Sequence, residues 1–321
     1  MAGLITAGAL SAIWCLIALR LGPAIGFVDL PDGGLKIHRR PAVPLGGVGI
    51  FSAVHIALAV EGRLDPGLLA ASGILLVAGL IDDRWKVSPW LRLGAALGAG
   101  VAMMAWSPVA TSAGSALLVA GVLLVVVTVN AVNLLDGLDG LAGSAAVLSA
   151  VGLAGLAAMR DLPGAFHLIL VGALVGFLLF NWHPARVFLG DNGAYVTGLF
   201  LAYGIIASSP RTPASDLVIA ITMLGVFLVD LAATILRRFR GRKALFGGDR
   251  DHLYDQLHRR GRSVPAVVLI AILVQSGFVA LALVLEAGEV GWWSLPVLFI
   301  VAGMVFGTLG AGGFLQRSPT R

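Results

Sequence analysis

The amino-acid sequence is divided almost from end to end into apolar runs that are long enough, or nearly long enough, to cross a lipid bilayer. A hydrocarbon core of about 30 Å needs roughly 20 apolar residues per helix, and shorter runs suffice where a helix tilts or packs among neighbours. Only 12% of the residues are charged, against about a quarter in a soluble domain. These features predict an all-α, polytopic integral membrane protein.

Eleven apolar runs can be delimited along the chain. They cover residues 3–20, 46–60, 68–81, 90–106, 114–132, 141–159, 165–181, 193–208, 217–236, 265–285 and 294–314. The second and third runs are short for isolated spans, so a count of ten transmembrane helices is the alternative. We expect one membrane domain over residues 1–321, with inner loops near 21–45, 82–90, 133–140, 182–192 and 237–264.

The basic residues predict the orientation of these spans, because cytoplasmic loops carry an excess of Lys and Arg. One set of alternate loops holds only Arg63, Arg160 and Arg211, and the remaining 19 of the 22 Lys and Arg residues lie on the other side. This distribution places the N-terminus outside and the C-terminus inside. The basic inner loops account for the formal charge of +5 and suit membrane lipid headgroups, and no nucleic-acid-binding module is apparent.

With this orientation, the acidic residues that end the apolar runs all fall on the cytoplasmic face. They are Asp82, Asp83, Asp136, Asp139, Asp191, Asp249, Asp251 and Asp255. Carboxylates that crowd together at a low-dielectric boundary repel one another unless a cation or a basic side chain compensates. A hard, oxygen-liganded ion that also contacts phosphate is typically Mg²⁺. The pattern therefore predicts an acidic metal site at the membrane surface, and an enzyme rather than a channel or scaffold.

Two motifs carry most of these acids. Asp82 and Asp83 end an apolar run, and adjacent helical residues diverge by about 100°, so one is expected to face the site while the other orients a base. A plain charge cluster at the headgroups is the alternative. Asn133, Asp136 and Asp139 recur at every third position, which predicts that they lie along one side of a helical turn.

Four further polar residues are candidates. Asp191 precedes an apolar run, where it could cap a helix, bind a metal ion or do both. Lys36 lies in a basic loop whose role is phosphate capture or topology alone. His252 lies in the long hydrophilic loop, where a histidine is usually solvated. Asp230 lies within the ninth run and is a functional candidate, or the partner of a nearby arginine.

Five segments occur in a fixed order between about residues 29 and 261: KIHRRPAVPLGG, GLIDDRWKVSP, NAVNLLDGLDGLAG, FNWHPARVFLGDNGAYVTG and DRDHLYDQLHRRG. This set resembles the polyprenyl-phosphate N-acetylhexosamine-1-phosphate transferases. The resemblance implies a multi-pass enzyme of the bacterial cytoplasmic membrane that uses Mg²⁺, with Mn²⁺ as the substitute ion. It implies transfer of a sugar-1-phosphate from a UDP-N-acetylhexosamine to undecaprenyl or decaprenyl phosphate with release of UMP, and a homodimer is a family expectation.

Within the family, the chain is more similar to the branch that initiates O-antigen or related cell-envelope glycans. Many members of that branch carry His-x-His-His in the last loop, whereas here His252 is followed by Tyr254 and Asp255. The alternatives are the phospho-MurNAc-pentapeptide transferase of peptidoglycan synthesis and, from another class, a secondary transporter. Transporters usually place buried acids near the bilayer midplane between related halves, which this sequence does not show.

The resemblance also implies roles for individual residues. We expect Asp191 and Asn133 at the metal ion, and Asp82 or Asp83 to deprotonate or orient the acceptor phosphate. The remaining predicted residues are expected to bind the nucleotide or to balance phosphate charge: Lys36, Asp136, Asp139, Asn181, Phe188, Arg250 and His252.

Overall fold

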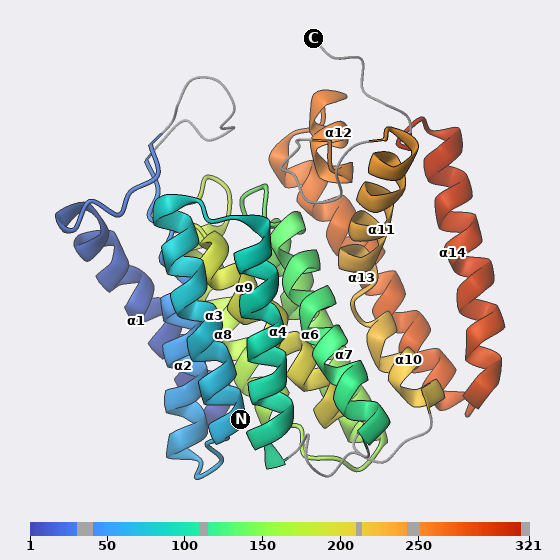
Figure 1. Ribbon diagram of the computed structural model, residues 1–321, viewed down its shortest axis with the longest axis horizontal. Coiled ribbons are helices and arrows are strands. Elements are labelled where there is room, and N and C mark those ends of the chain that lie inside the picture. Colours follow the sequence, from blue (N-terminus) through green and yellow to red (C-terminus); the bar gives the residue numbers. More distant parts are fainter. Residues whose placement is uncertain (31–40, 109–114, 210–213, 243–250, 316–321) are drawn as a thin grey trace.

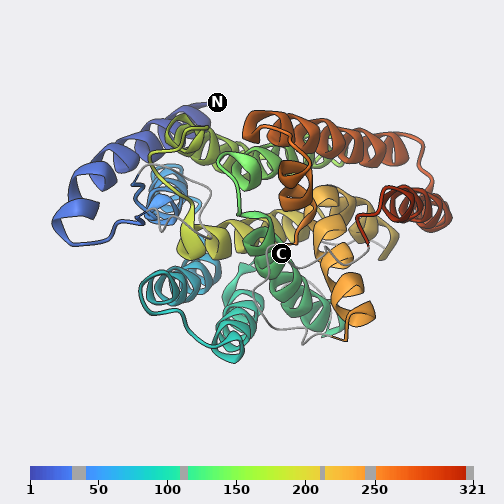
Figure 2. The same cartoon turned by 90° about the horizontal axis from the view of Figure 1, so that it is seen from above.

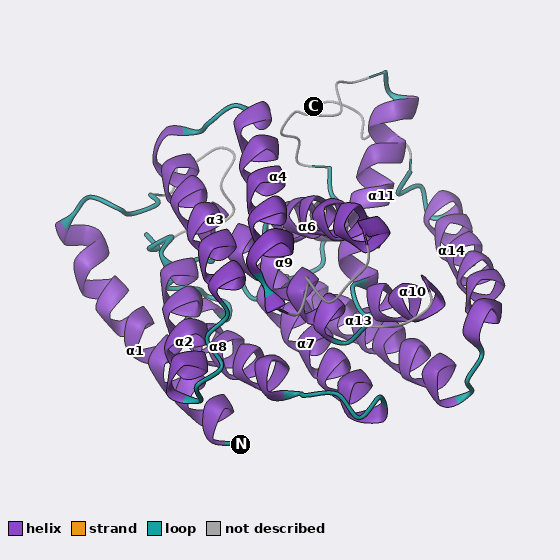
Figure 3. Cartoon of the chain, turned by 60° about the horizontal axis from the view of Figure 1, so that its bottom comes forward, coloured by secondary structure: helices purple, strands orange, loops and turns teal. Residues whose placement is uncertain are grey.

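The computed structural model describes residues 1–30, 41–108, 115–209, 214–242 and 251–315, and within them the regular structure is helical (Figure 3). The α-helices are α1 (Ala2–Ala24), α2 (Gly46–Val60), α3 (Pro66–Trp85), α4 (Pro89–Trp106), α6 (Ser115–Leu135), α7 (Leu141–Met159), α8 (Ala165–Asn181), α9 (Gly190–Ala207), α10 (Ala214–Thr222), α11 (Gly225–Arg240), α12 (Leu253–Arg259), α13 (Val264–Ala287) and α14 (Ser294–Ala311). The all-helical prediction is confirmed.

The long helices cross the molecule in alternating directions, as the predicted spans require (Figure 1). The turns that follow α3, α6 and α8 lie at one end of the bundle, together with α12. The N-terminus lies at the opposite end. Segments that are far apart in the sequence, and that carry the predicted acids, are therefore brought to the same end.

Within the part of the chain that the structure describes, five helices have the length and apolarity to cross a membrane: Ala2–Ala24, Pro66–Trp85, Leu118–Leu135, Leu141–Met159 and Val264–Ala287. Among the described residues, shorter apolar helices occupy Gly46–Val60, Ala165–Asn181 and Ile300–Ala311. Exposed tryptophans mark both ends of α4, with Trp90 at its start and Trp106 at its end. Tryptophan is enriched at membrane–water interfaces, so this pair is typical of a spanning helix.

Helix α9 lies at the centre of the bundle (Figure 2), and nearly all of its residues are buried. It packs against α2, α3 and α6, and glycines allow these helices to approach closely. A Cβ atom at Gly79 would collide with the backbone of Asn192, and one at Gly47 would collide with the backbone of Gly193. The contacts fix the N-terminal end of α9, which is where Asp191 lies.

The ninth predicted span is not one continuous helix, which corrects the expectation for residues 217–236. It is broken between α10 and α11, and side chains of neighbouring helices satisfy the backbone at the break. Gln275 accepts a hydrogen bond from Val226 N at 3.0 Å and donates one to Met223 O at 2.6 Å. Ser149 also donates to Met223 O, at 2.7 Å. Such breaks are tolerated in a membrane where polar partners re-satisfy the freed backbone groups.

Candidate active site

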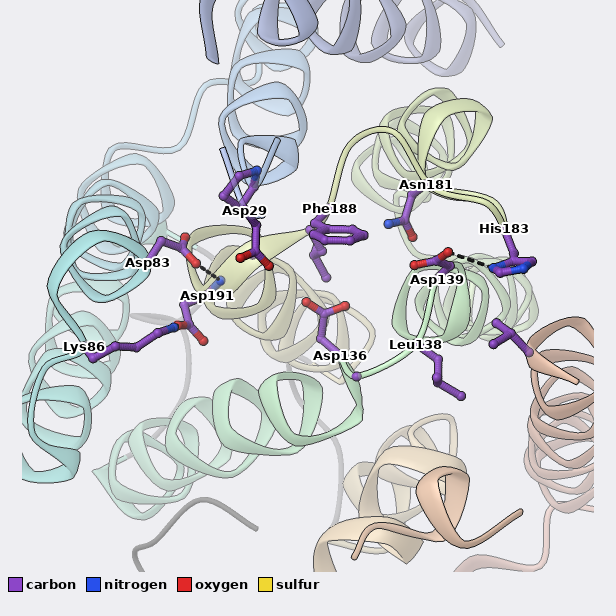
Figure 4. A pocket seen from close by; sticks show the side chains of 15 residues that line it. Asp29, Asp83, Lys86, Asp136, Leu138, Asp139, Asn181, His183, Phe188 and Asp191 are labelled. Atoms are coloured by element: carbon purple, nitrogen blue, oxygen red, sulfur yellow. Dashed lines mark hydrogen bonds and ion pairs between the residues drawn. The ribbon is translucent and has the colours of Figure 1, made fainter. Parts of the chain in front are cut away.

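A cleft opens at the end of the bundle where the acidic segments meet, and it has two lobes of about 420 and 680 Å³. Lys86, Asp136, Gly137 and Asp191 line both lobes, so the two are continuous. The smaller lobe is strongly acidic: besides Asp136 and Asp191, its walls carry Asp29, Asp83 and Asp139 (Figure 4). In this described lining, Lys86 is the one lysine or arginine.

Asp83 holds the N-terminal end of α9 and so positions Asp191. Its Oδ1 accepts a hydrogen bond from Asp191 N at 2.9 Å, and its Oδ2 accepts from Asn192 N at 3.1 Å and from Asn192 Nδ2 at 2.6 Å. A carboxylate is favourable here because the first N–H groups of a helix lack intrahelical partners. Asp83 thus supplies, from α3, the cap that α9 does not obtain from its own residues.

Asp191 is directed into the cleft rather than back onto its own helix. Its Oδ1 accepts a hydrogen bond from Asn133 Nδ2 at 2.7 Å, and its Oδ2 lies 3.4 Å from Lys86 Nζ. The expected helix-capping alternative for Asp191 does not hold, because Asp83 provides that interaction. The structure brings together Asp191 and Asn133, the two residues predicted to bind the metal.

Asp82 diverges from Asp83 and does not line the cleft. Its side chain is fully buried, and Arg92 Nε lies 2.7 Å from its Oδ2. Tyr195 donates a hydrogen bond to Asp82 Oδ2 at 2.6 Å, and Val87 N donates to Oδ1 at 3.0 Å. The aspartate pair therefore splits into Asp83 at the cleft and Asp82 in an internal ion pair, a position that does not favour contact between Asp82 and a substrate.

Asp136 lies in the turn that follows α6 and lines both lobes of the cleft. Burial raises the pKa of Asp136 well above its ordinary value, and the neighbouring carboxylates of Asp191, Asp83 and Asp139 raise it further. A hydrogen bond from the Gly190 backbone offsets only part of this effect. The crowding of negative charge around Asp136 is the electrostatic feature that a cation would relieve.

Asp139 does not continue the line of Asn133 and Asp136 along a helix, because α6 ends at Leu135 and a turn follows. Instead, Asp139 Oδ2 accepts hydrogen bonds from Ala185 N at 3.0 Å and from the His183 ring at 2.8 Å (Figure 4). The prediction that Asn133, Asp136 and Asp139 share one helix face is therefore wrong. The three still reach the same cleft, because the turn folds back towards the segment after α8.

Asn181 and Phe188 flank the smaller lobe. Asn181 Oδ1 accepts a hydrogen bond from Gly140 N at 3.0 Å, and its Nδ2 donates to Val187 O at 3.0 Å. This buried amide joins the acidic turn to the segment that leads into α9. Phe188 presents its ring beside Asp136 and Asn181 (Figure 4).

His252 is buried at the larger lobe, contrary to the expectation of a solvated loop histidine. Its Nδ1 lies 2.7 Å from Oδ2 of Asp230, which is also buried. Asp230 is therefore paired with this histidine rather than with a nearby arginine. Lys36 and Arg250, also predicted at the site, lie outside the described residues, as does Asp249.

Several residues that line the cleft were not predicted from the sequence as site residues. Lys86 contacts Asp191, and its place four residues after Asp82 gave a signal that it would project from the same helix end. Asp29 lines the smaller lobe because residues 29 and 42 pair in an isolated bridge, which no local pattern indicates. Tyr195 and His183 interact with the predicted acids Asp82 and Asp139 across the fold.

The donor chemistry of the cleft fits an Mg²⁺ ion that is completed by water and substrate. In the described part of the chain, no three His, Cys, Asp or Glu side chains form a ready ligand set. Mg²⁺ does not require one, because it keeps several waters and takes one or two carboxylates together with substrate phosphates. Asp191 and Asp136 both line the cleft and supply hard carboxylate oxygens, while Asn133 contributes an amide.

Comparison with known proteins gives a consistent result. The family model for glycosyl transferase family 4 matches residues 66–209. The chain is 30% identical to the probable undecaprenyl-phosphate N-acetylglucosaminyl 1-phosphate transferase of Bacillus subtilis, over 89% of this chain and 84% of the relative. It is 28% identical to the decaprenyl-phosphate N-acetylglucosaminephosphotransferase of Mycobacterium tuberculosis, over 80% and 74%. It is also 28% identical to the undecaprenyl-phosphate alpha-N-acetylglucosaminyl 1-phosphate transferase of Yersinia pestis, over 92% and 87%.

These relatives align with 80–92% of the chain, and the family-model match at residues 66–209 includes Asp83, Asp136 and Asp191 of the cleft. The chain belongs to glycosyl transferase family 4, the polyprenyl-phosphate N-acetylhexosamine-1-phosphate transferases, and is a membrane-embedded phosphoglycosyltransferase.

Proposed function

We propose that this enzyme transfers N-acetylglucosamine-1-phosphate from its UDP-sugar to a polyprenyl phosphate, releases UMP and so begins a lipid-linked cell-envelope glycan. The observation that carries the proposal is the convergence of Asp83, Asp136 and Asp191 with Lys86 in one cleft of a membrane-embedded family member. The names of the relatives support the GlcNAc-1-phosphate group and the prenyl phosphate acceptor. We further propose that the cleft faces the cytoplasm, where the sugar nucleotide is available.

In the proposed reaction, an oxygen of the acceptor phosphate attacks the sugar-bearing phosphorus of the donor. The bond from that phosphorus to the bridging oxygen breaks, and UMP leaves with the electron pair. This chemistry needs positioning and charge neutralisation more than it needs covalent participation by the protein. A two-step route through an aspartyl phosphate is chemically allowed, and trapping of a labelled enzyme would distinguish it.

The two lobes divide the substrates. We place the uridine in the smaller lobe beside Phe188 and Asn181, and the pyrophosphate in the shared region near Lys86 and Asp191. We place the acceptor phosphate where the smaller lobe meets the shared region, beside Asp83, and the sugar in the larger lobe. Its walls include Leu231 and other apolar side chains of α4 and α11, which suit the first units of a prenyl chain.

Asp191, Asn133 and Asp136 would hold Mg²⁺, which when bound would neutralise charge on the donor phosphates. Lys86 lies 3.4 Å from Asp191 and is placed to share that task. Asp83 is the member of the aspartate pair that reaches the cleft, so it is the one placed to orient the acceptor phosphate. Asp83 also keeps α9, and with it Asp191, in position through its three hydrogen bonds.

The proposal is tested with the purified full-length protein, undecaprenyl phosphate, UDP-GlcNAc and Mg²⁺, by measuring UMP and the lipid product. We expect both products in equal amounts, and we expect chelation of Mg²⁺ or D191A to abolish them. A matched control is D161N, because Asp161 is an exposed acid in the turn after α7, outside the lining of both lobes. Near-normal turnover of D191A would exclude the metal assignment.

The donor is tested with a panel of UDP-GlcNAc, UDP-GalNAc, a UDP-6-deoxy-N-acetylhexosamine and UDP-MurNAc-pentapeptide. We expect UDP-GlcNAc to give the highest kcat/KM. Preference for the pentapeptide donor would instead identify the peptidoglycan enzyme. Flux of a solute across vesicles without any UMP release would favour the secondary transporter.

A further inference from the structure

The short helix α12 is tied to α11 through one buried aspartate. Asp230 Oδ2 lies 2.7 Å from His252 Nδ1, and Asp230 Oδ1 accepts a hydrogen bond from Leu253 N at 2.9 Å. Both side chains of the Asp230–His252 pair are almost completely buried. The first turn of α12 is therefore fixed in place at the larger lobe.

Tyr254 extends this connection from α12 to α6. Its ring stacks on the His252 ring, with centroids 5.3 Å apart and planes inclined by 4°. Its hydroxyl donates a hydrogen bond to Leu134 O at 3.1 Å. Leu134 lies in the last turn of α6, where carbonyl groups lack intrahelical partners. Tyr254 thus satisfies the end of α6 immediately before the turn that carries Asp136.

Gly137, the residue after Asp136, is shaped to receive Tyr254. A Cβ atom at Gly137 would collide with the Tyr254 hydroxyl and with its ring. Gly137 is not among the described glycines with a positive φ, whereas Gly140 has a φ of 77°. The requirement for glycine at position 137 is therefore space for Tyr254, while at position 140 it is backbone conformation.

We propose that Tyr254 is a positioning residue that clamps the turn carrying Asp136. Its hydrogen bond to Leu134 O and its close approach to Gly137 are the contacts that hold this turn. Only the kinetic test rests on the proposed function, because the clamp is a contact within the protein. Loss of the clamp should displace Asp136 and lower turnover, while the fold of the bundle remains.

A double-mutant cycle between positions 137 and 254 tests the clamp. The clash should shift the turn that carries Asp136, and a misplacement of about 1 Å can lower a rate by about 100-fold, so G137A alone should lower kcat by about 10- to 100-fold. In the Y254A background, where the clash is absent, G137A should add less than about 2-fold. G140A is the matched control, because its cost comes from φ and should be the same in both backgrounds. Additive effects of G137A and Y254A would overturn the clamp.

The conservative variant separates positioning from a general loss of structure. Y254F keeps the ring that stacks on His252, so we expect it to retain most of the kcat that Y254A loses. Y203F is a control, because the Tyr203 hydroxyl bonds to Asp65 far from the cleft. A Y254A enzyme with the kcat of the wild type would overturn the clamp.

The same cycle is measured by thermal unfolding of the four proteins in detergent. Coupling of the melting temperatures supports the contact between Tyr254 and Gly137 even if no sugar nucleotide is turned over, and additive shifts count against it. Failure of the proposed function, seen as a wild-type protein that releases no UMP, is thereby distinguished from failure of the clamp.

Discussion

The separation of Asp82 from Asp83 predicts that the two neighbouring carboxylates fail in different ways when each is changed to asparagine. Asp82 is fully buried and faces Arg92, whose Nε lies 2.7 Å and whose Nη2 lies 2.9 Å from its two oxygens. Tyr195 adds a hydrogen bond at 2.6 Å. D82N keeps the shape of the side chain, but it leaves the guanidinium of Arg92 without its counter-charge.

The magnitude follows from this geometry. Breaking a buried ion pair by removing one partner costs about 3–5 kcal/mol. The side chain of Arg92 is 33% exposed, so water screens the remaining charge and the loss should be near the lower limit, about 3 kcal/mol. At roughly 2 °C per kcal/mol for a chain of this size, D82N should melt about 6 °C below the wild type. D83N should instead lose hydrogen bonds to the start of α9, and turnover should fall about 10- to 100-fold.

The assay compares melting temperature in detergent with UMP release at a temperature where each variant is folded. R92Q provides the partner variant, and D82N/R92Q should recover part of the stability, because neither charge is then left unpaired. A D82N protein that melts within about 1 °C of the wild type but has lost turnover would refute the reasoning. It would show that Asp82 acts on the substrate rather than through Arg92 and Tyr195.

Three further predictions concern helix packing, charge and topology. G79A should lower the melting temperature and turnover, because its Cβ would collide with the Asn192 backbone at a cost of about 1–3 kcal/mol. In the control G73A, on the same helix, the added Cβ meets nothing within 4 Å, so this variant should be neutral. If G79A behaves like G73A, the close packing of α3 on α9 is wrong. D136N should raise the melting temperature when Mg²⁺ is chelated, because it removes one of the crowded carboxylates, and saturating Mg²⁺ should remove that advantage. A D136N protein that melts below the wild type in chelator would contradict the proposed repulsion between carboxylates. In a C15S background, a cysteine at position 63 should react with an impermeant maleimide from outside intact cells, whereas a cysteine at position 88 should react only after permeabilisation. Labelling of both cysteines from one side would exclude the proposed orientation.

Most of the fold could be predicted because apolar length and basic loops are local properties of the sequence. The runs at 46–60, 90–106, 141–159 and 165–181 correspond closely to α2, α4, α7 and α8. The break between α10 and α11 could not be read in the same way. It depends on Gln275 of α13 and Ser149 of α7, which lie more than 50 residues from the break along the chain. No local pattern in the ninth run specifies those partners.

The candidate site shows the same division between local and long-range information. Spacing indicated that Asp83, Asp136 and Asp191 would gather at one end, since each follows or precedes an apolar run. It could not indicate which aspartate of the pair would face inward. That choice depends on Arg92, which lies ten residues further along the chain in α4, and on Tyr195 in α9. Likewise, the burial of His252 depends on Asp230 in another helix.

These long-range contacts explain how an apolar chain with few charged residues can hold several carboxylates close together in one cleft. Asp83 holds the start of α9, Asn181 holds the turn after Asp139, and Tyr254 holds the end of α6, so neutral or internally satisfied groups build the frame of the cleft. The carboxylates of Asp136 and Asp191 therefore do not have to cap their own helices. A frame of this kind keeps two acids close together despite their repulsion, and that stored repulsion is what a divalent cation and its bound phosphates would relieve.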